Sequence, residues 1–251
     1  MTMLPTDSTA RARHDWANGF RFPPAVLRFA AASLAGAVLV AALSAGLFDA
    51  ALVHVAVTTI LFLAAALFAA TRMARDYPHA ALGLANVVTL ARLGLTAALV
   101  SQILSGEATP WLVFALAVAA LCLDGMDGWL ARWQRLTSRF GAMFDMEVDA
   151  ALGLVLALNA LAAGTVGPAV LLLALPRYAF AATGRILPWM ARPLPERRGR
   201  KLVCVLQIAA LIALQLPLLG DMQAALIVTA TALALAWSFG RDILWLWRNR
   251  P

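Results

Sequence analysis

Apolar residues dominate eight long stretches of the chain, which are separated by short groups of glycine, proline and charged residues. Each stretch approaches the length of about 20 helical residues that a bilayer crossing needs. The stretches span residues 26–47, 50–71, 84–105, 110–132, 141–163, 168–187, 201–219 and 222–247. No ten-residue segment alternates apolar and polar positions as the strands of a membrane barrel do. The pattern therefore predicts an all-α integral membrane protein with about eight transmembrane helices.

The composition agrees with this pattern. Of the 251 residues, 63% are hydrophobic and 13% are charged, and the mean hydropathy is +0.82. A soluble domain is about half apolar, and about a quarter of its residues are charged. A single soluble core cannot bury this much apolar surface, so most of it must face lipid. An ordinary soluble enzyme is excluded.

The formal charge of +7 has a distribution that predicts the topology. The turns near 47–50, 106–110, 164–168 and 217–222 contain no Lys or Arg, and most basic residues gather at the opposite helix ends. Arg92 and Arg177 lie deeper within predicted stretches, where a charge needs a polar cavity or a partner. Basic residues favour the cytoplasmic side of a membrane. We therefore predict a multi-pass protein of a bacterial inner membrane with both termini in the cytoplasm. Topology and anionic lipid account for the charge, and no nucleic-acid partner is expected.

Acidic residues are concentrated between two predicted helices. Asp124 and Asp127 are three residues apart, and Asp145 and Asp149 are four apart. Each pair therefore shares one helix face. A short link makes the two helices antiparallel neighbours, so the four carboxylates can converge. Glu147 falls off the shared face and is expected outside the cluster.

Four converging carboxylates at membrane depth repel one another and resist desolvation. A hard divalent cation removes that cost, and oxygen ligands suit Mg²⁺, Mn²⁺ or Ca²⁺ rather than zinc. Two such cations would balance the four charges and clamp both ends of a phosphoryl displacement. The alternative is that the acids pair with Arg132, Arg135 and Arg139 at the membrane surface. It explains the charges but not their placement on two matched helix faces.

The acidic stretch resembles the signature of the CDP-alcohol phosphotransferases (CDP-alcohol phosphatidyltransferases), D-x₂-D-G-x₂-A-R-x₈-G-x₃-D-x₃-D. The chain matches every fixed position and every spacing, with Asp124, Asp127, Gly128, Ala131, Arg132, Gly141, Asp145 and Asp149. Eight fixed positions within 26 residues make this resemblance very specific.

The resemblance implies a role for each matched residue. Asp124, Asp127 and Asp145 would bind two Mg²⁺ or Mn²⁺ ions, and Asp149 would be a further ligand and the general base. The remaining matched residues would line the CDP pocket: Gly128, Ala131, Arg132 and Gly141. The family fold has six transmembrane helices around a polar cavity open to the cytoplasm, and it is usually a homodimer. The catalytic core would cover 80–251, and 1–79 would form a cytoplasmic N-terminus and two accessory helices.

Flanking residues extend the resemblance more weakly. Asn86, Thr89 and Arg92 look like the family's N-x₂-T-x₂-R, which adds them to the predicted CDP-binding set. The stretch GRKLVCVLQ looks like a degraded form of the family's G-K-x-K-T-x-x-Q. Three basic residues are candidates to bind an anionic acceptor: Arg177, Arg185 and Lys201.

The implied reaction moves a phosphatidyl-type group from a CDP-linked lipid, CDP-diacylglycerol first, onto an alcohol, and releases CMP. Glycerol 3-phosphate is the first choice of acceptor, while serine, an inositol phosphate and phosphatidylglycerol stay open.

Three other classes of protein compete with this interpretation. A membrane prenyltransferase would need a second Asp-rich motif, and the later half of the chain offers only isolated Asp221 and Asp242. A cation transporter would show two related halves. An inactive lipid-binding scaffold would not need intact acids.

Overall fold

The computed structural model describes residues 23–106, 109–192, 194–195 and 198–250. Within this part the chain is all-helical and forms no strand, which confirms the predicted fold class. Most of the predicted cytoplasmic N-terminus, residues 1–22, lies outside the described residues. The helices are α2 (Pro24–Leu47), α3 (Leu52–Asp76), α4 (Leu84–Ser105), α5 (Pro110–Trp133), α6 (Arg139–Ala162), α7 (Leu175–Ile186), α8 (Arg198–Ala213) and α9 (Asp221–Arg248), with short 3₁₀ helices η1 (Pro168–Leu173) and η2 (Pro188–Ala191).

Five of the described helices are long and apolar enough to cross a membrane, namely α2, α3, α4, α5 and α9. The chain is therefore a multi-pass membrane protein. The 24 residues of α6 have the necessary length. However, it contains Asp145, Glu147 and Asp149, and it is not among the five.

Two of the eight predicted stretches do not form continuous helices of the expected length. The 168–187 stretch is divided into η1 and α7, which meet at Ala174. Pro176 explains the break, because its ring clashes with the carbonyl four residues earlier and it has no N–H to donate. The predicted 201–219 helix instead begins at Arg198 and ends at Ala213. Pro217 limits it in the same way, since its ring would clash with the carbonyl of Ala213.

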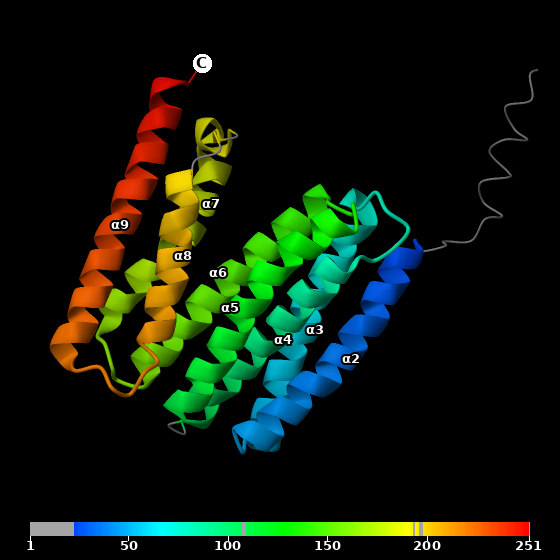
Figure 1. Ribbon diagram of the computed structural model, residues 1–251, viewed down its shortest axis with the longest axis horizontal. Coiled ribbons are helices and arrows are strands. Elements are labelled where there is room, and N and C mark those ends of the chain that lie inside the picture. Colours follow the sequence, from blue (N-terminus) through cyan, green and yellow to red (C-terminus); the bar gives the residue numbers. More distant parts are fainter. Residues whose placement is uncertain (1–22, 107–108, 193, 196–197, 251) are drawn as a thin grey trace, which may run out of the picture.

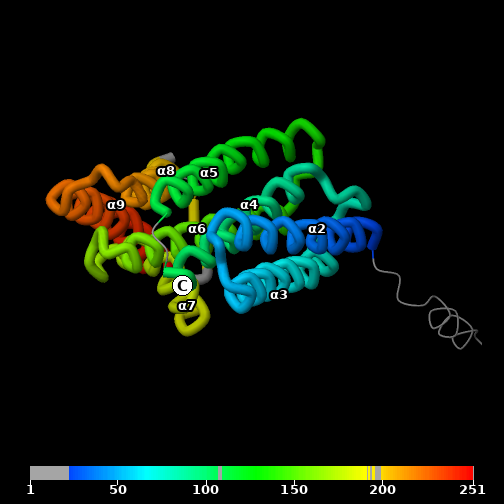
Figure 2. Tube along the Cα trace, turned by 90° about the horizontal axis from the view of Figure 1, so that it is seen from below, coloured from blue at the N-terminus to red at the C-terminus, as the bar shows by residue number. Residues whose placement is uncertain are grey.

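The helices form two groups that share α6. Helices α2 to α5 lie beside one another, α7 to α9 form a second group, and α6 runs between them (Figure 1). Helix α4 packs against α2, α3, α5 and α6. Seen from below, α5 lies on one side of α4, and α2 and α3 lie on the other (Figure 2). Helices α4 and α6 therefore stand at the centre, where their polar residues meet.

Two clusters of buried apolar side chains hold this arrangement. One joins α4, α5 and α6 to α8 and α9, and includes Leu99, Leu156 and Leu211. The other joins α2 and α3 to α4 and α6, and includes Phe29 and Phe62. Because α4 and α6 contribute to both clusters, the two N-terminal helices are fastened to the same pair of helices that carries the polar site.

Candidate active site

Arg92 of α4 lies at the centre of the four aspartates that the sequence singles out. Its Nη1 atom is 2.9 Å from Asp124 Oδ1, 3.1 Å from Asp127 Oδ2 and 2.5 Å from Asp145 Oδ1. Its Nη2 atom donates to Asp149 Oδ1. One guanidinium thus joins α4 to carboxylates from both α5 and α6. The expected convergence of the two aspartate pairs is found in this arrangement.

The arginine is buried, whereas the site remains open on its acidic side. The side chain of Arg92 is 1% exposed and that of Asp127 is 8% exposed. Asp124 is 34% exposed, Asp145 is 35% exposed and Asp149 is 42% exposed. A buried charge at membrane depth needs a partner, and Arg92 has four. The three more exposed carboxylates are accessible to a ligand.

The chain turns sharply between the two acidic helices. Helix α5 ends at Trp133 and α6 begins at Arg139. Ser138 caps α6, because its Oγ accepts from the backbone N–H of Gly141 at 3.0 Å. On the other side of the link, Gln134 Oε1 accepts from the backbone N–H of Leu84 at 2.7 Å. The link is therefore fastened to the start of α6 and to the start of α4.

A pocket of about 230 Å³ opens beside the aspartates, between α4, α5 and the start of α6. Six of the seven predicted CDP-binding residues line it: Asn86, Thr89, Gly128, Ala131, Arg132 and Gly141. The seventh, Arg92, lies among the carboxylates instead. Asp127 and Asp145 also line the pocket, so the pocket and the carboxylate cluster are continuous.

Small residues keep the pocket open. A Cβ atom at Gly141 would lie 3.3 Å from Asn86 Oδ1 and 3.2 Å from Ser138 Oγ, which is closer than most such contacts. The absence of a side chain at Gly141 therefore leaves room for the Asn86 amide. Arg132 folds back along α5, with its Nη1 3.5 Å from the place where a Cβ of Gly128 would lie. Its exposed guanidinium is available to a phosphate oxygen.

The predicted acceptor residues belong to α7 and α8, and none of the three lines this pocket. Arg177 lies in the first turn of α7 rather than deep inside a long helix, and its Nη2 donates to Glu147 Oε1 at 3.0 Å. Glu147 is thus turned away from the aspartate cluster, as its helical position predicts. Arg185 and Lys201 are exposed, and Lys201 is near enough to Asp124 to interact with it electrostatically.

The carboxylate cluster fits a divalent cation by its chemistry. One oxygen from each of Asp124, Asp127 and Asp145 lies within 4.8 Å of the others. Oxygen ligands from carboxylates suit Mg²⁺ or Mn²⁺. Arg92 is a counter-charge that was not predicted for this place, and it leaves the four carboxylates with a net charge of −3. Cationic charge is still needed for balance.

Sequence reasoning missed several pocket residues. The link contributes Leu136, Thr137 and Ser138 to the lining. Of these, Ser138 has a readable signal, because a serine just before a helical pattern favours the N-cap position. The position of Thr137 depends on how the link folds, which no local pattern specifies.

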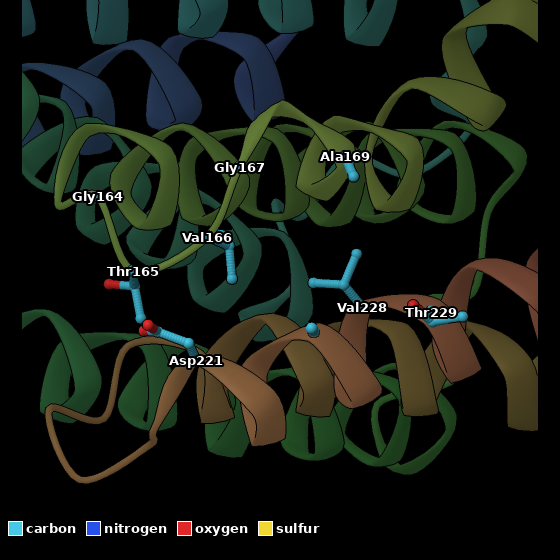
Figure 3. A pocket seen from close by; sticks show the side chains of 9 residues that line it. Gly164, Thr165, Val166, Gly167, Ala169, Asp221, Val228 and Thr229 are labelled. Carbon is cyan, nitrogen blue, oxygen red and sulfur yellow. The ribbon is translucent and has the colours of Figure 1, made fainter.

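A second hollow, of about 360 Å³, lies at the other end of α6. It is formed by the segment from Gly164 to Ala169 and the first turns of α9 (Figure 3). Asp221 is the charged side chain among its described lining residues, and it is exposed at the start of α9. This hollow is separate from the aspartate site.

Together, the fold and the site define a multi-pass membrane protein with a carboxylate cluster that could hold a metal ion, beside a pocket with a basic wall. The sequence model of the CDP-alcohol phosphatidyltransferase family matches residues 82–239. The chain therefore belongs to that family, and it is a phosphotransferase that moves a phosphatidyl-type group from a CDP-alcohol to an alcohol. No curated protein and no solved structure matched the chain in the other two comparisons.

Proposed function

We propose that the protein transfers a phosphatidyl group from CDP-diacylglycerol to glycerol 3-phosphate and releases CMP, at the cytoplasmic face of a bacterial inner membrane. The observation that carries the proposal is the continuity of the carboxylate cluster with a pocket lined by Asn86, Arg132 and Gly141. A diphosphate that spans the two would have its nucleotide in the pocket and its reacting phosphorus near the aspartates. Family membership favours this reaction over the prenyltransferase and the transporter.

In this proposal, the acceptor hydroxyl oxygen attacks the phosphorus that bears the lipid. A new P–O bond forms, the bond to the bridging oxygen of the diphosphate breaks, and CMP leaves with that oxygen. Asp149 takes the hydroxyl proton. Its carboxylate is the most exposed of the four, which supports its use as a base that an incoming alcohol can reach.

Asp124, Asp127 and Asp145 would hold two divalent cations, Mg²⁺ or Mn²⁺, with Asp149 as a further ligand. Such ions supply charge neutralisation for the phosphates when they are bound. Arg132 would donate to the diphosphate, and Asn86 and Thr89 would position the nucleotide. Arg92 would keep the carboxylates at a fixed separation, because it contacts all four. Two subunits would associate as a homodimer.

The proposal is tested with purified protein, CDP-diacylglycerol and a panel of acceptors, with lipid products identified by mass spectrometry. We expect CMP release and phosphatidylglycerol phosphate when glycerol 3-phosphate and Mg²⁺ are present. Excess EDTA should lower the rate by at least about a hundredfold, since phosphate charge would no longer be neutralised. If a lipid product formed only with serine, inositol phosphate or phosphatidylglycerol, glycerol 3-phosphate would be the wrong acceptor. Turnover that EDTA leaves untouched would exclude the metal role.

The basic residues of α7 should affect binding of the alcohol acceptor more than binding of the CDP-linked lipid. For Arg177→Gln, we expect the KM for glycerol 3-phosphate to rise about tenfold, the factor that corresponds to one charge-assisted hydrogen bond. The KM for CDP-diacylglycerol should change less than about twofold. The control is Arg72→Gln, which changes an exposed arginine of α3. Equal shifts in both KM values would remove Arg177 from the acceptor site.

A further inference from the structure

The two N-terminal helices and the link that follows them precede the family match, which begins at residue 82. The end of this pair of helices that includes Phe29, Tyr77 and His79 nevertheless contacts residues in or next to the wall of the nucleotide pocket. We propose that Tyr77, just after α3, is a positioning residue for that pocket, so that the α2–α3 hairpin is a working part of the catalytic unit. The inference rests on the proposed function, because it takes the pocket to bind a cytidine nucleotide.

The phenol of Tyr77 reaches the pocket through one backbone carbonyl. Its Oη lies 2.8 and 2.9 Å from the carbonyl oxygens of Ala81 and Leu82, and these two acceptors share its single O–H donor. The Nδ2 of Asn86 donates to the same oxygen of Leu82 at 2.6 Å. Tyr77 therefore helps to hold the Leu82 carbonyl, and this carbonyl sets the direction of the Asn86 side-chain amide. With Nδ2 held there, the Oδ1 of Asn86 faces Gly141, inside the pocket.

The surroundings of this hydroxyl are tightly specified. Gly83 has a φ of +75°, which strongly favours glycine. A Cβ atom at Gly83 would lie 3.4 Å from the Tyr77 hydroxyl and 3.3 Å from Leu136, which lines the pocket. A phenol is protonated at neutral pH, and burial raises the pKa of the Tyr77 phenol further above its ordinary value, so the hydroxyl is available as a donor.

Aromatic contacts extend the same support to α6. The ring of Tyr77 meets Phe140 edge-on, with centroids 5.9 Å apart. Phe29 of α2 meets both Phe140 and Phe144 edge-on, at 6.5 and 5.8 Å. Phe140 precedes Gly141 in the chain, and Phe144 precedes Asp145. The hairpin thus fixes the rotation of the first turns of α6, on which the pocket wall and one aspartate depend.

A third contact joins the link after α3 to the link between α5 and α6. His79 Nε2 lies 3.1 Å from the carbonyl oxygen of Thr137, within hydrogen-bond distance. Thr137 lines the pocket. Contacts from Phe29, Tyr77 and His79 therefore reach residues that line the pocket or directly precede lining residues in the chain.

The opposite end of the hairpin offers a matched control. Thr58 of α3 lies 3.3 Å from Ser44 of α2 and 3.4 Å from Ser101 of α4, oxygen to oxygen, and all three residues are buried. Hydroxyl contacts of this kind join helices inside a membrane. Thr58 and Tyr77 are about 28 Å apart along the helix axis. Loss of the Thr58 hydroxyl should therefore weaken the attachment of the hairpin without a direct effect on the pocket.

The test compares Tyr77→Phe with Thr58→Val in the full chain, purified in detergent. Tyr77→Phe keeps the ring against Phe140 and removes only the hydroxyl. We expect the Kd for CMP and the KM for CDP-diacylglycerol to rise about three- to tenfold, as the loss of one hydrogen bond predicts, while kcat changes less than about twofold. Thr58→Val should lower the Tm and leave both binding constants unchanged.

Three results would overturn the inference in distinguishable ways. Wild-type CMP affinity in Tyr77→Phe, beside active wild-type protein, would exclude the positioning role alone. A similar loss of CMP affinity in Thr58→Val would show that general loosening of the hairpin causes the effect. Wild-type protein that neither binds CMP nor cleaves CDP-diacylglycerol would overturn the proposed function and this inference with it.

Discussion

Replacement of Asp149 by asparagine should abolish turnover and leave nucleotide binding largely intact. The amide cannot accept the proton of the attacking alcohol, and loss of a general base costs about 10²- to 10⁴-fold in rate. Asparagine has nearly the same shape, and Asp149 is not among the residues that line the pocket beside the aspartates. The measurement is a pair of values for each protein, kcat with CDP-diacylglycerol and Kd for CMP.

Asp221→Asn is the matched control, since it makes the same chemical change at the far end of the helices, beside the second hollow. It should retain wild-type kcat and CMP affinity. Near-normal turnover in Asp149→Asn would remove Asp149 as the base. A large loss of CMP affinity in that variant would instead assign the residue to binding.

Of the substitutions proposed for this protein, replacement of Arg92 by glutamine should lower the free energy of unfolding the most. Removal of one partner from a buried ion pair typically costs about 3–5 kcal/mol, because the opposite charge is left uncompensated. Here the cost should be near the lower end, about 3 kcal/mol, since three of the four carboxylates are at least one-third exposed. The free energy of unfolding should therefore fall strongly, as measured by thermal melts in detergent.

The same variant should become more dependent on divalent cations. With Arg92 gone, an added cation would be the main counter-charge, so Mg²⁺ should raise the Tm of Arg92→Gln more than that of the wild type. Arg72→Gln, which changes an exposed arginine, should melt like the wild type with and without Mg²⁺. An unchanged Tm in Arg92→Gln would contradict the central role of this arginine.

Local patterns in the sequence were sufficient to predict most of the helices and the meeting of the aspartates. The i, i+3 and i, i+4 spacings place each acidic pair on one face, and a short link forces their helices together. The two helices with wrong predicted lengths are explained by proline. Residues 168–187 and 201–219 are apolar enough to predict continuous helices, but Pro176 and Pro217 interrupt or limit them. Hydropathy reports the preference for lipid, whereas continuity of a helix depends on its hydrogen bonds.

The position of Arg92 was harder to predict. Its depth in α4 signalled a polar partner, and the resemblance to the family favoured the nucleotide. Whether the guanidinium faces the pocket or the carboxylates depends on the rotation of α4 against α5 and α6. That rotation is set by packing across three helices, including contacts with α2 and α3. No spacing within α4 contains this information.

The bridge from Arg92 to α5 and α6 also constrains the order of membrane insertion. Because α4 is synthesised before α5 and α6, its arginine leaves the ribosome before the acids that neutralise it have been made. An unpaired arginine at the centre of a membrane helix costs about 2.5–3.5 kcal/mol on insertion scales. The complete set of ion pairs around Arg92 can therefore form only after both α5 and α6 have been made.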